Sequence, residues 1–146
     1  MIVLSNSTTQ VIPAGGTVTF DMTPLHTGCN SEGYGGAEYH KQGTGLVRLR
    51  ASTKCRPGVF EINFSGNVSN PAAGTQLNLA INLDGATLPE TNMLETVLVA
   101  GLFENVSTAT AVKVCPDNGG SVTVVNNGTD PVILAPGSSL YIKRIA

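Results

Sequence analysis

The sequence predicts an all-β protein, a two-sheet antiparallel sandwich of the jelly-roll kind with about 8–10 strands. Three observations lead to this prediction. Apolar and polar residues alternate with a period of two over 57–85, which is the side-chain period of half-buried strands. Turn-forming clusters recur between short apolar runs, with 17 Gly and 8 Pro in the chain, and no segment keeps a helical spacing over two turns.

The clearest alternation lies in 57–85, which we expect to form a hairpin on which the core assembles. Asn70, Pro71 and Gly74 supply the reversal between its two strands. Asp84-Gly85 is a second turn signal at its far end. The residues expected to face the core are Phe60, Ile62, Phe64, Val68, Leu77, Leu79, Ile81 and Leu83.

The rest of the chain predicts further short strands and one long loop. The strands are expected at 9–13, 16–22, 46–51, 109–115, 121–126, 131–135 and 138–145. The core candidates before the hairpin are Val11, Val18, Phe20, Val47 and Leu49. The glycine-rich stretch 21–37 is expected to be an exposed loop. We treat 1–146 as a single domain, in which 1–8 is a candidate N-terminal arm or a frayed end.

One segment, 95–103 (ETVLVAGLF), breaks the alternation because it is apolar on both parities. We expect a strand buried on both faces, with Gly101 as a bulge. In a two-layer domain the second face needs a partner such as another subunit. The subunit-interface candidates are Val97, Leu98, Val99, Leu102 and Phe103, together with Tyr141 on one face of the last strand.

Composition argues against several classes of partner. The formal net charge is −2, so no basic field exists to hold nucleic acid. No apolar run approaches the roughly 18 residues of a spanning helix, and MIVLSNSTTQ does not read as a signal peptide. We therefore expect no membrane partner and synthesis in a cytoplasm. Charged residues are only 12%, about half the usual share of about 25%, which favours a surface covered by partners over a solitary monomer.

No pattern of catalytic residues stands out, so we expect no enzyme and no cofactor. His26 and His40 are the only histidines, and no GxSxG, HExxH or P-loop occurs. Cys29, Cys55 and Cys115 are not in CxxC pairs, so zinc is poorly supported. Idle thiols and a Cys29–Cys55 bridge both remain open.

A second set of residues consists of candidates for contact with a partner: Tyr34, Tyr39, His40, Arg48 and Arg50. The two tyrosines belong to the glycine-rich region and could contact a glycan or receptor. Three copies of His40 on a three-fold axis could bind a metal or anion, although a turn histidine with ordinary hydrogen bonds is the simpler interpretation. Arg48 and Arg50 could pair between subunits with Glu38 or Glu61, or form a solvated strand face.

Several short motifs occur in a recognisable order. They are Gly28-Cys29, the run His40-Lys41-Gln42-Gly43-Thr44-Gly45, Cys55-Arg56, Asn82-Leu83-Asp84-Gly85, Val124-Val125-Asn126-Asn127-Gly128-Thr129 and Tyr141-Ile142-Lys143-Arg144-Ile145-Ala146. This order resembles small virion proteins of phages and prophages of gut Firmicutes over about 28–146. The histidine segment there more often reads His-Arg-Glu-Gly-Ser-Gly, so Gln42 and Thr44 depart from it. The strand plan also resembles the TNF/C1q-like jelly roll.

The resemblance implies a homotrimer built about its last strands and located in the virion. Such a protein would be a capsid decoration or head-fibre component, in contact with the major capsid protein or another virion protein, and without chemistry of its own. The alternative is a receptor- or glycan-binding module at a fibre or tail tip that contacts a host surface glycan through the 28–45 region.

Overall fold

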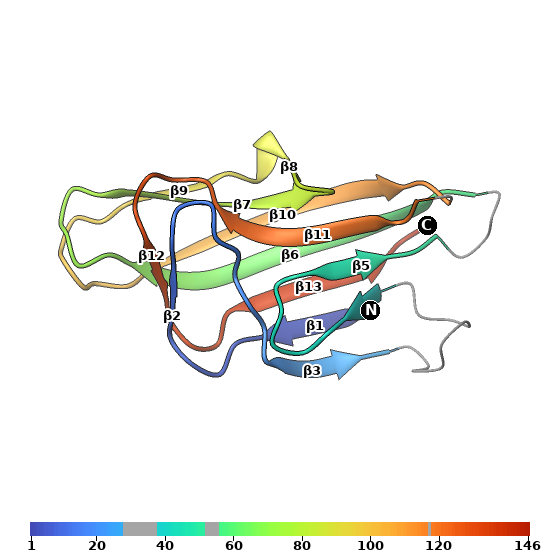
Figure 1. Ribbon diagram of the computed structural model, residues 1–146, viewed down its shortest axis with the longest axis horizontal. Coiled ribbons are helices and arrows are strands. Elements are labelled where there is room, and N and C mark those ends of the chain that lie inside the picture. Colours follow the sequence, from blue (N-terminus) through green and yellow to red (C-terminus); the bar gives the residue numbers. More distant parts are fainter. Residues whose placement is uncertain (28–37, 52–55, 117) are drawn as a thin grey trace.

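The computed structural model describes residues 1–27, 38–51, 56–116 and 118–146, and these form two antiparallel sheets packed face to face (Figure 1). The described residues contain thirteen strands and one short 3-10 helix, Pro89–Thr91. No helix among them is long and apolar enough to cross a membrane. The predicted all-β sandwich is therefore confirmed.

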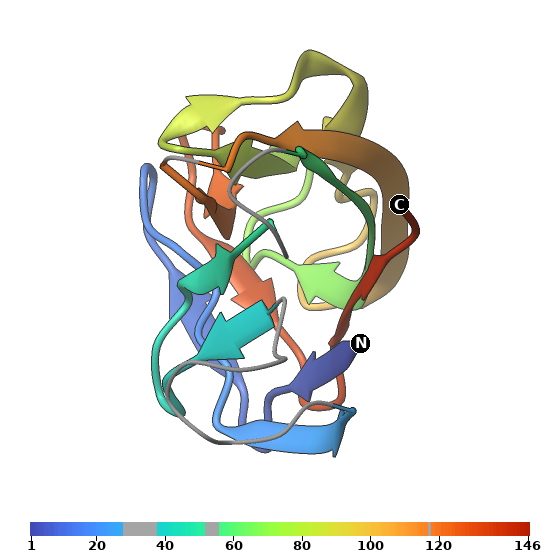
Figure 2. The same cartoon turned by 90° about the vertical axis from the view of Figure 1, so that its right-hand side faces the viewer.

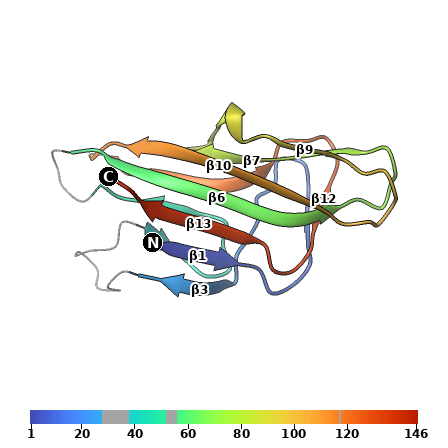
Figure 3. The same cartoon turned by 180° about the vertical axis from the view of Figure 1, so that it is seen from behind.

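The first sheet has seven strands, five of which lie side by side in Figure 3 in the order β10, β6, β13, β1, β3. β10 pairs along nearly the whole of β6, while β13 and β12 pair with successive parts of the other edge of β6. The strands are β1 (Ile2–Ser5), β2 (Gln10–Ile12), β3 (Met22–His26), β6 (Gly58–Ser69), β10 (Glu104–Val114), β12 (Val132–Leu134) and β13 (Ser139–Arg144).

The second sheet has six strands, in the order β4-β5-β11-β7-β8, with β9 also paired with β7. Seen end-on, β4 and β5 lie across the sandwich from β1 and β13 (Figure 2). The strands are β4 (Glu38–His40), β5 (Val47–Leu49), β7 (Gln76–Leu83), β8 (Ala86–Thr87), β9 (Met93–Thr96) and β11 (Gly120–Asn126).

Alternate residues of both sheets fill the space between them. Phe20, Phe60 and Phe64 are the largest fully buried side chains. Every predicted core residue of 57–85 is buried except Leu83, which packs against the core while partly exposed. The period-two pattern thus identified the buried face of both long strands.

The predicted pairing of those two strands is wrong. β6 pairs with β10, β12 and β13, whereas β7 pairs with β8, β9 and β11. The connection 70–75 therefore carries the chain from one sheet to the other, and the two apolar faces meet across the core. Alternation fixes which face of a strand is buried, but a hairpin and a crossing between sheets both satisfy it.

The prediction of a doubly buried strand at 95–103 is also wrong. β9 ends at Thr96, and 97–103 is a loop that is bonded to the connection 70–75. Val97 donates to the carbonyl of Thr75 at 2.9 Å, and Gly101 donates to that of Asn70 at 3.0 Å. Gly101 has a φ of 75°, so it serves a turn rather than a strand bulge.

Two predictions near the N-terminus need correction. Residues 2–5 are not an arm, because β1 is hydrogen-bonded between β13 and β3 and buries Ile2 and Leu4. Val11 was expected in the core but is 67% exposed, while its neighbour Ile12 is buried. The alternation of β2 was thus assigned to the wrong parity.

Candidate functional site

The outward face of the seven-stranded sheet is a broad surface with few charges, which we call the uncharged face. Along β1, β6, β10 and β13 it consists of residues that alternate with buried residues, and at the edge strand β3 it includes Leu25. In register across the sheet lie Leu25, Val3, Tyr141, Asn63 and Ala109. A second row consists of Ser139, Ser65 and Ser107.

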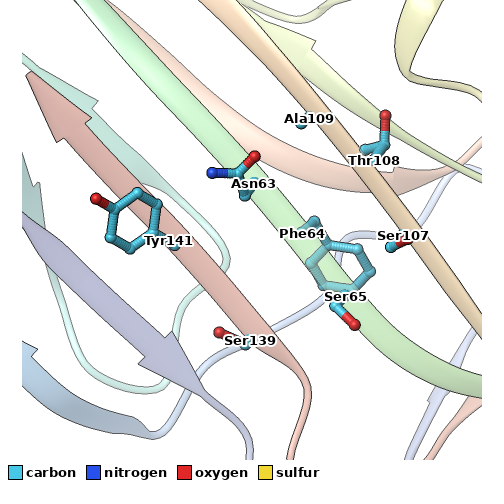
Figure 4. Close-up of a pocket in the computed structure, with 8 residues that line it drawn as sticks. All are labelled: Asn63, Phe64, Ser65, Ser107, Thr108, Ala109, Ser139 and Tyr141. Atoms are coloured by element: carbon cyan, nitrogen blue, oxygen red, sulfur yellow. The ribbon is translucent and has the colours of Figure 1, made fainter. Parts of the chain in front are cut away.

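The middle of this face is a shallow depression of about 480 Å³ (Figure 4). The depression arises from a difference in side-chain size, because the short serine and alanine side chains lie beside the larger ring of Tyr141. Figure 4 shows the tyrosine ring on β13 next to Asn63 of β6. The lining residues are Asn63, Phe64, Ser65, Ser107, Thr108, Ala109, Ser139 and Tyr141.

The only charged groups on the neighbouring rows are at one end of the face. Glu61 is opposite Lys143 of β13 and Ala111 of β10, and Lys113 follows one row further. Asn63 donates to the Glu61 carboxylate at 3.2 Å. The centre offers hydroxyls, an amide and one aromatic ring, which can donate and accept hydrogen bonds.

A second apolar surface lies on the loop 97–103, at the opposite end of the molecule from the two chain termini (Figure 1). Val97 is in the core at 1% exposure, so it is not available to a neighbouring subunit. The other interface candidates of this segment are exposed to solvent. They are Leu98 at 77%, Val99 at 58%, Leu102 at 49% and Phe103 at 44%.

The partner-contact candidates divide between two sides of the smaller sheet. Tyr39 pairs in register with Arg48, so these two share the outward face. Arg50 follows directly after β5 and is also exposed. Tyr34 lies outside the described residues. His40 belongs to the opposite parity, and its Nε2 hydrogen-bonds the Thr44 carbonyl at 2.9 Å.

The His40 ring packs edge-on against Phe20, with ring centroids 6.3 Å apart. It therefore helps to close the core rather than to contact a partner. Among the residues that the structure describes, no group of three His, Cys, Asp or Glu side chains could hold a metal ion. Cys115 is exposed and unbridged, while Cys29 and Cys55 lie outside the described residues.

Glu38 is not available for an ion pair with Arg48 or Arg50. Its side chain faces inward, and its Oε2 lies 3.1 Å from the amino group of Met1. This is the only salt bridge within the described part of the chain. Glu61, the other predicted partner, belongs to the opposite sheet.

The connection between β2 and β3 holds one carboxylate with a shifted pKa. The Ser7 hydroxyl donates to one oxygen of Asp21, and the Ser7 amide donates to the other at 2.8 Å. These bonds favour the ionised form and lower the pKa of Asp21 below its usual 3.8. Gln42 donates to the Asp21 carbonyl at 2.6 Å, so the amide at this position has a structural role.

Sequence reasoning missed the uncharged face, because it treated the polar parity of 57–69 as ordinary strand surface. The signal that could have identified it is the run of small uncharged residues at alternate positions of β10, namely Asn105, Ser107, Ala109 and Ala111. An exposed strand face normally carries charges.

Similarity to solved structures shows the fold. Murine APRIL at pH 5.0 is 13% identical, with a TM-score of 0.66, covering 99% of this chain and 98% of that chain. The globular domain of zebrafish complement 1qA is 12% identical, with a TM-score of 0.59, covering 96% and 94%. The chain thus has the TNF/C1q-like jelly-roll fold. No protein-family model and no curated sequence matches it.

Proposed function

We propose that this chain is a structural virion protein, a capsid decoration or head-fibre component that acts as a homotrimer through protein–protein binding and without catalysis. The observation that carries the proposal is the uncharged face. It joins five strands of one sheet and presents Tyr141 beside small side chains. A face without charges at its centre suits a second copy of the chain, because no charged group has to be desolvated on contact.

The virion assignment draws support from the motif order over 28–146 and from the 12% share of charged residues. The TNF/C1q-like fold favours a binding module over an enzyme. The exposed loop 97–103 then offers a second apolar contact. It lies at the far end of the molecule from the termini and could meet another virion protein while the uncharged face is used between copies.

Native mass spectrometry of the full chain tests the assembly. The wild type is expected to be a trimer, and Ser107→Arg is expected to shift it to monomer, because the new charge would be buried at the centre of the uncharged face. Thr123→Arg is the matched control, since Thr123 is on the outward parity of β11 in the other sheet. A wild-type monomer, or a trimer that survives Ser107→Arg, would contradict the proposed interface.

The loop and the location need their own measurements. Leu98→Asp leaves the uncharged face untouched, so the trimer is expected to persist while attachment to the particle weakens. Loss of the trimer in this variant would show that the subunit interface includes the loop 97–103 instead of the uncharged face. Electron microscopy of labelled particles is expected to place the protein on the capsid. A position at the fibre or tail tip would favour the receptor- or glycan-binding alternative instead.

That alternative is favoured by one observation, the pairing of Tyr39 with Arg48 on the outward face of the smaller sheet, with Arg50 directly after β5. An aromatic ring beside cationic side chains is a common arrangement in binding sites.

A further inference from the structure

A groove crosses the outward face of the six-stranded sheet where the turn between β10 and β11 meets β5. Its volume is about 510 Å³. The side chains that line it come from three separate segments of the chain. They include Leu46, Arg48, Arg50, Asp84, Asn118 and Ser121.

Among the described residues that line the groove, two carry a positive charge and one a negative charge. Arg48 belongs to β5 and Arg50 follows directly after the last residue of that strand, and both side chains line the groove. Neither forms a salt bridge with another described residue. Among the described residues that line the groove, the one carboxylate is that of Asp84, which already accepts bonds from the amide and hydroxyl of Ser121 at 2.8 and 3.2 Å.

Two glycines, Gly119 and Gly120, are among the residues that line the groove. Gly119 has a φ of 64°, and a Cβ added there would lie 2.8 Å from the carbonyl oxygen of Leu49. A side chain at this position is therefore excluded by both conformation and contact. The close approach brings the turn beside the end of β5, next to Arg50.

An exposed aromatic residue, Tyr39, lies next to one of the lining arginines. Tyr39 is directly opposite Arg48 in the ladder and is 60% exposed. Directly paired residues have Cβ atoms about 5 Å apart, so the ring and the guanidinium border the same space. Leu46, on the same parity of the chain as Arg48, is 37% exposed and adds an apolar side chain.

We propose that this groove binds a carboxylate-bearing oligosaccharide, such as a chain of uronic acids. Arg48 and Arg50 hold carboxylates through paired hydrogen bonds, Ser121 and Asn118 bind sugar hydroxyls, and the Tyr39 ring packs against a sugar face. An acidic peptide would use the arginines but not the Tyr39 ring. The inference deepens the glycan-binding alternative and requires neither the trimer nor a place on the virion.

Calorimetric titration of the full chain with tetragalacturonic acid tests the proposal. Binding is expected, and it should weaken as salt rises because exposed charges are screened. Arg48→Gln/Arg50→Gln should weaken it about tenfold or more, since loss of about 1.4 kcal/mol corresponds to tenfold. Lys113→Gln/Lys143→Gln is the matched control, because it removes two positive charges from the other sheet and should leave affinity unchanged.

Titrations with two further ligands distinguish a sugar acid from a neutral sugar and from an acidic peptide. The methyl ester of tetragalacturonic acid lacks the charges and should not bind, and amide resonances of Gly119 and Gly120 should shift only with the acid. Absence of binding by the acid, or an equal loss in both double variants, overturns the proposal. Binding of hexaglutamate but not of the sugar acid assigns the groove to acidic peptides and overturns it too. Native mass spectrometry of each variant reports the trimer separately.

Discussion

Replacing Asn126 by alanine tests how strongly one buried amide holds the two sheets together. Asn126 is fully buried at the end of β11. Its side chain donates to the carbonyl of Ile12 at 3.0 Å and to that of Asp130 at 2.8 Å, and it accepts from the amide of Gly128 at 2.9 Å. The first of these bonds reaches β2 in the opposite sheet.

The expected loss follows from those three bonds. A typical hydrogen bond contributes about 0.5–1.5 kcal/mol net, and a buried group left without a partner costs about 1–3 kcal/mol. The carbonyl of Ile12 would be a buried group left without a partner, because its bond with Asn126 is buried. The bonds to Asp130 and Gly128 are only partly buried. We expect Asn126→Ala to lower the free energy of unfolding by about 3–4 kcal/mol.

Urea denaturation followed by circular dichroism measures this change, at one protein concentration because assembly would add to stability. Asn127→Ala is the matched control, since the Asn127 side chain makes a single exposed bond to Thr87 and should contribute less than about 1 kcal/mol. The denaturant slope should stay constant in both variants. Equal, small losses in the two would refute the reasoning.

Three further predictions concern other parts of the chain. Ser7→Ala should raise the pKa of Asp21 in an NMR titration, because the hydroxyl bond to the carboxylate is lost. The lowered pKa of Asp21 stabilises the folded protein above pH 3.8, and this stabilisation is lost as the pH falls through the pKa of Asp21 in the folded state. The loss of stability on acidification should therefore be smaller in Ser7→Ala. Val97→Ala should lower the free energy of unfolding by about 2–3 kcal/mol in urea denaturation, whereas Leu98→Ala should change it by no more than about 0.5 kcal/mol. Gly119→Ala should cost more than about 2 kcal/mol in the same assay, because a Cβ there meets backbone at 2.8 Å.

Each of these has an outcome that would contradict it. An unchanged Asp21 titration would remove Ser7 as the cause of the shift. Equal losses for the two loop variants would mean that 97–103 is not arranged as described. Gly43 has a φ of 81° but no atom within 4 Å of an added Cβ, so Gly43→Ala should cost less than Gly119→Ala. Equal costs would show that conformation alone, without contact, decides both.

For much of the candidate site, the sequence predicts which way a single residue faces but not which residues lie together. Alternation placed Arg48 outward on β5, and the structure brings Tyr39 beside it through the pairing of β4 with β5. His40 was a candidate for contact with a partner, yet the parity of β4 turns its ring toward Phe20, and its Nε2 makes an ordinary hydrogen bond with the Thr44 carbonyl. The depression at Tyr141 requires the register of three strands that are distant in sequence.

The sequence by itself determined the fold class and the buried parity of the long strands, because side-chain alternation depends only on the local backbone. Only the tertiary structure decided that β6 and β7 belong to different sheets, since non-local pairing chooses between arrangements that bury the same residues. Tertiary structure also decided that 97–103 is a loop. Val97 is buried there while Leu98 is exposed, because the loop is held by the connection 70–75 rather than by a strand partner.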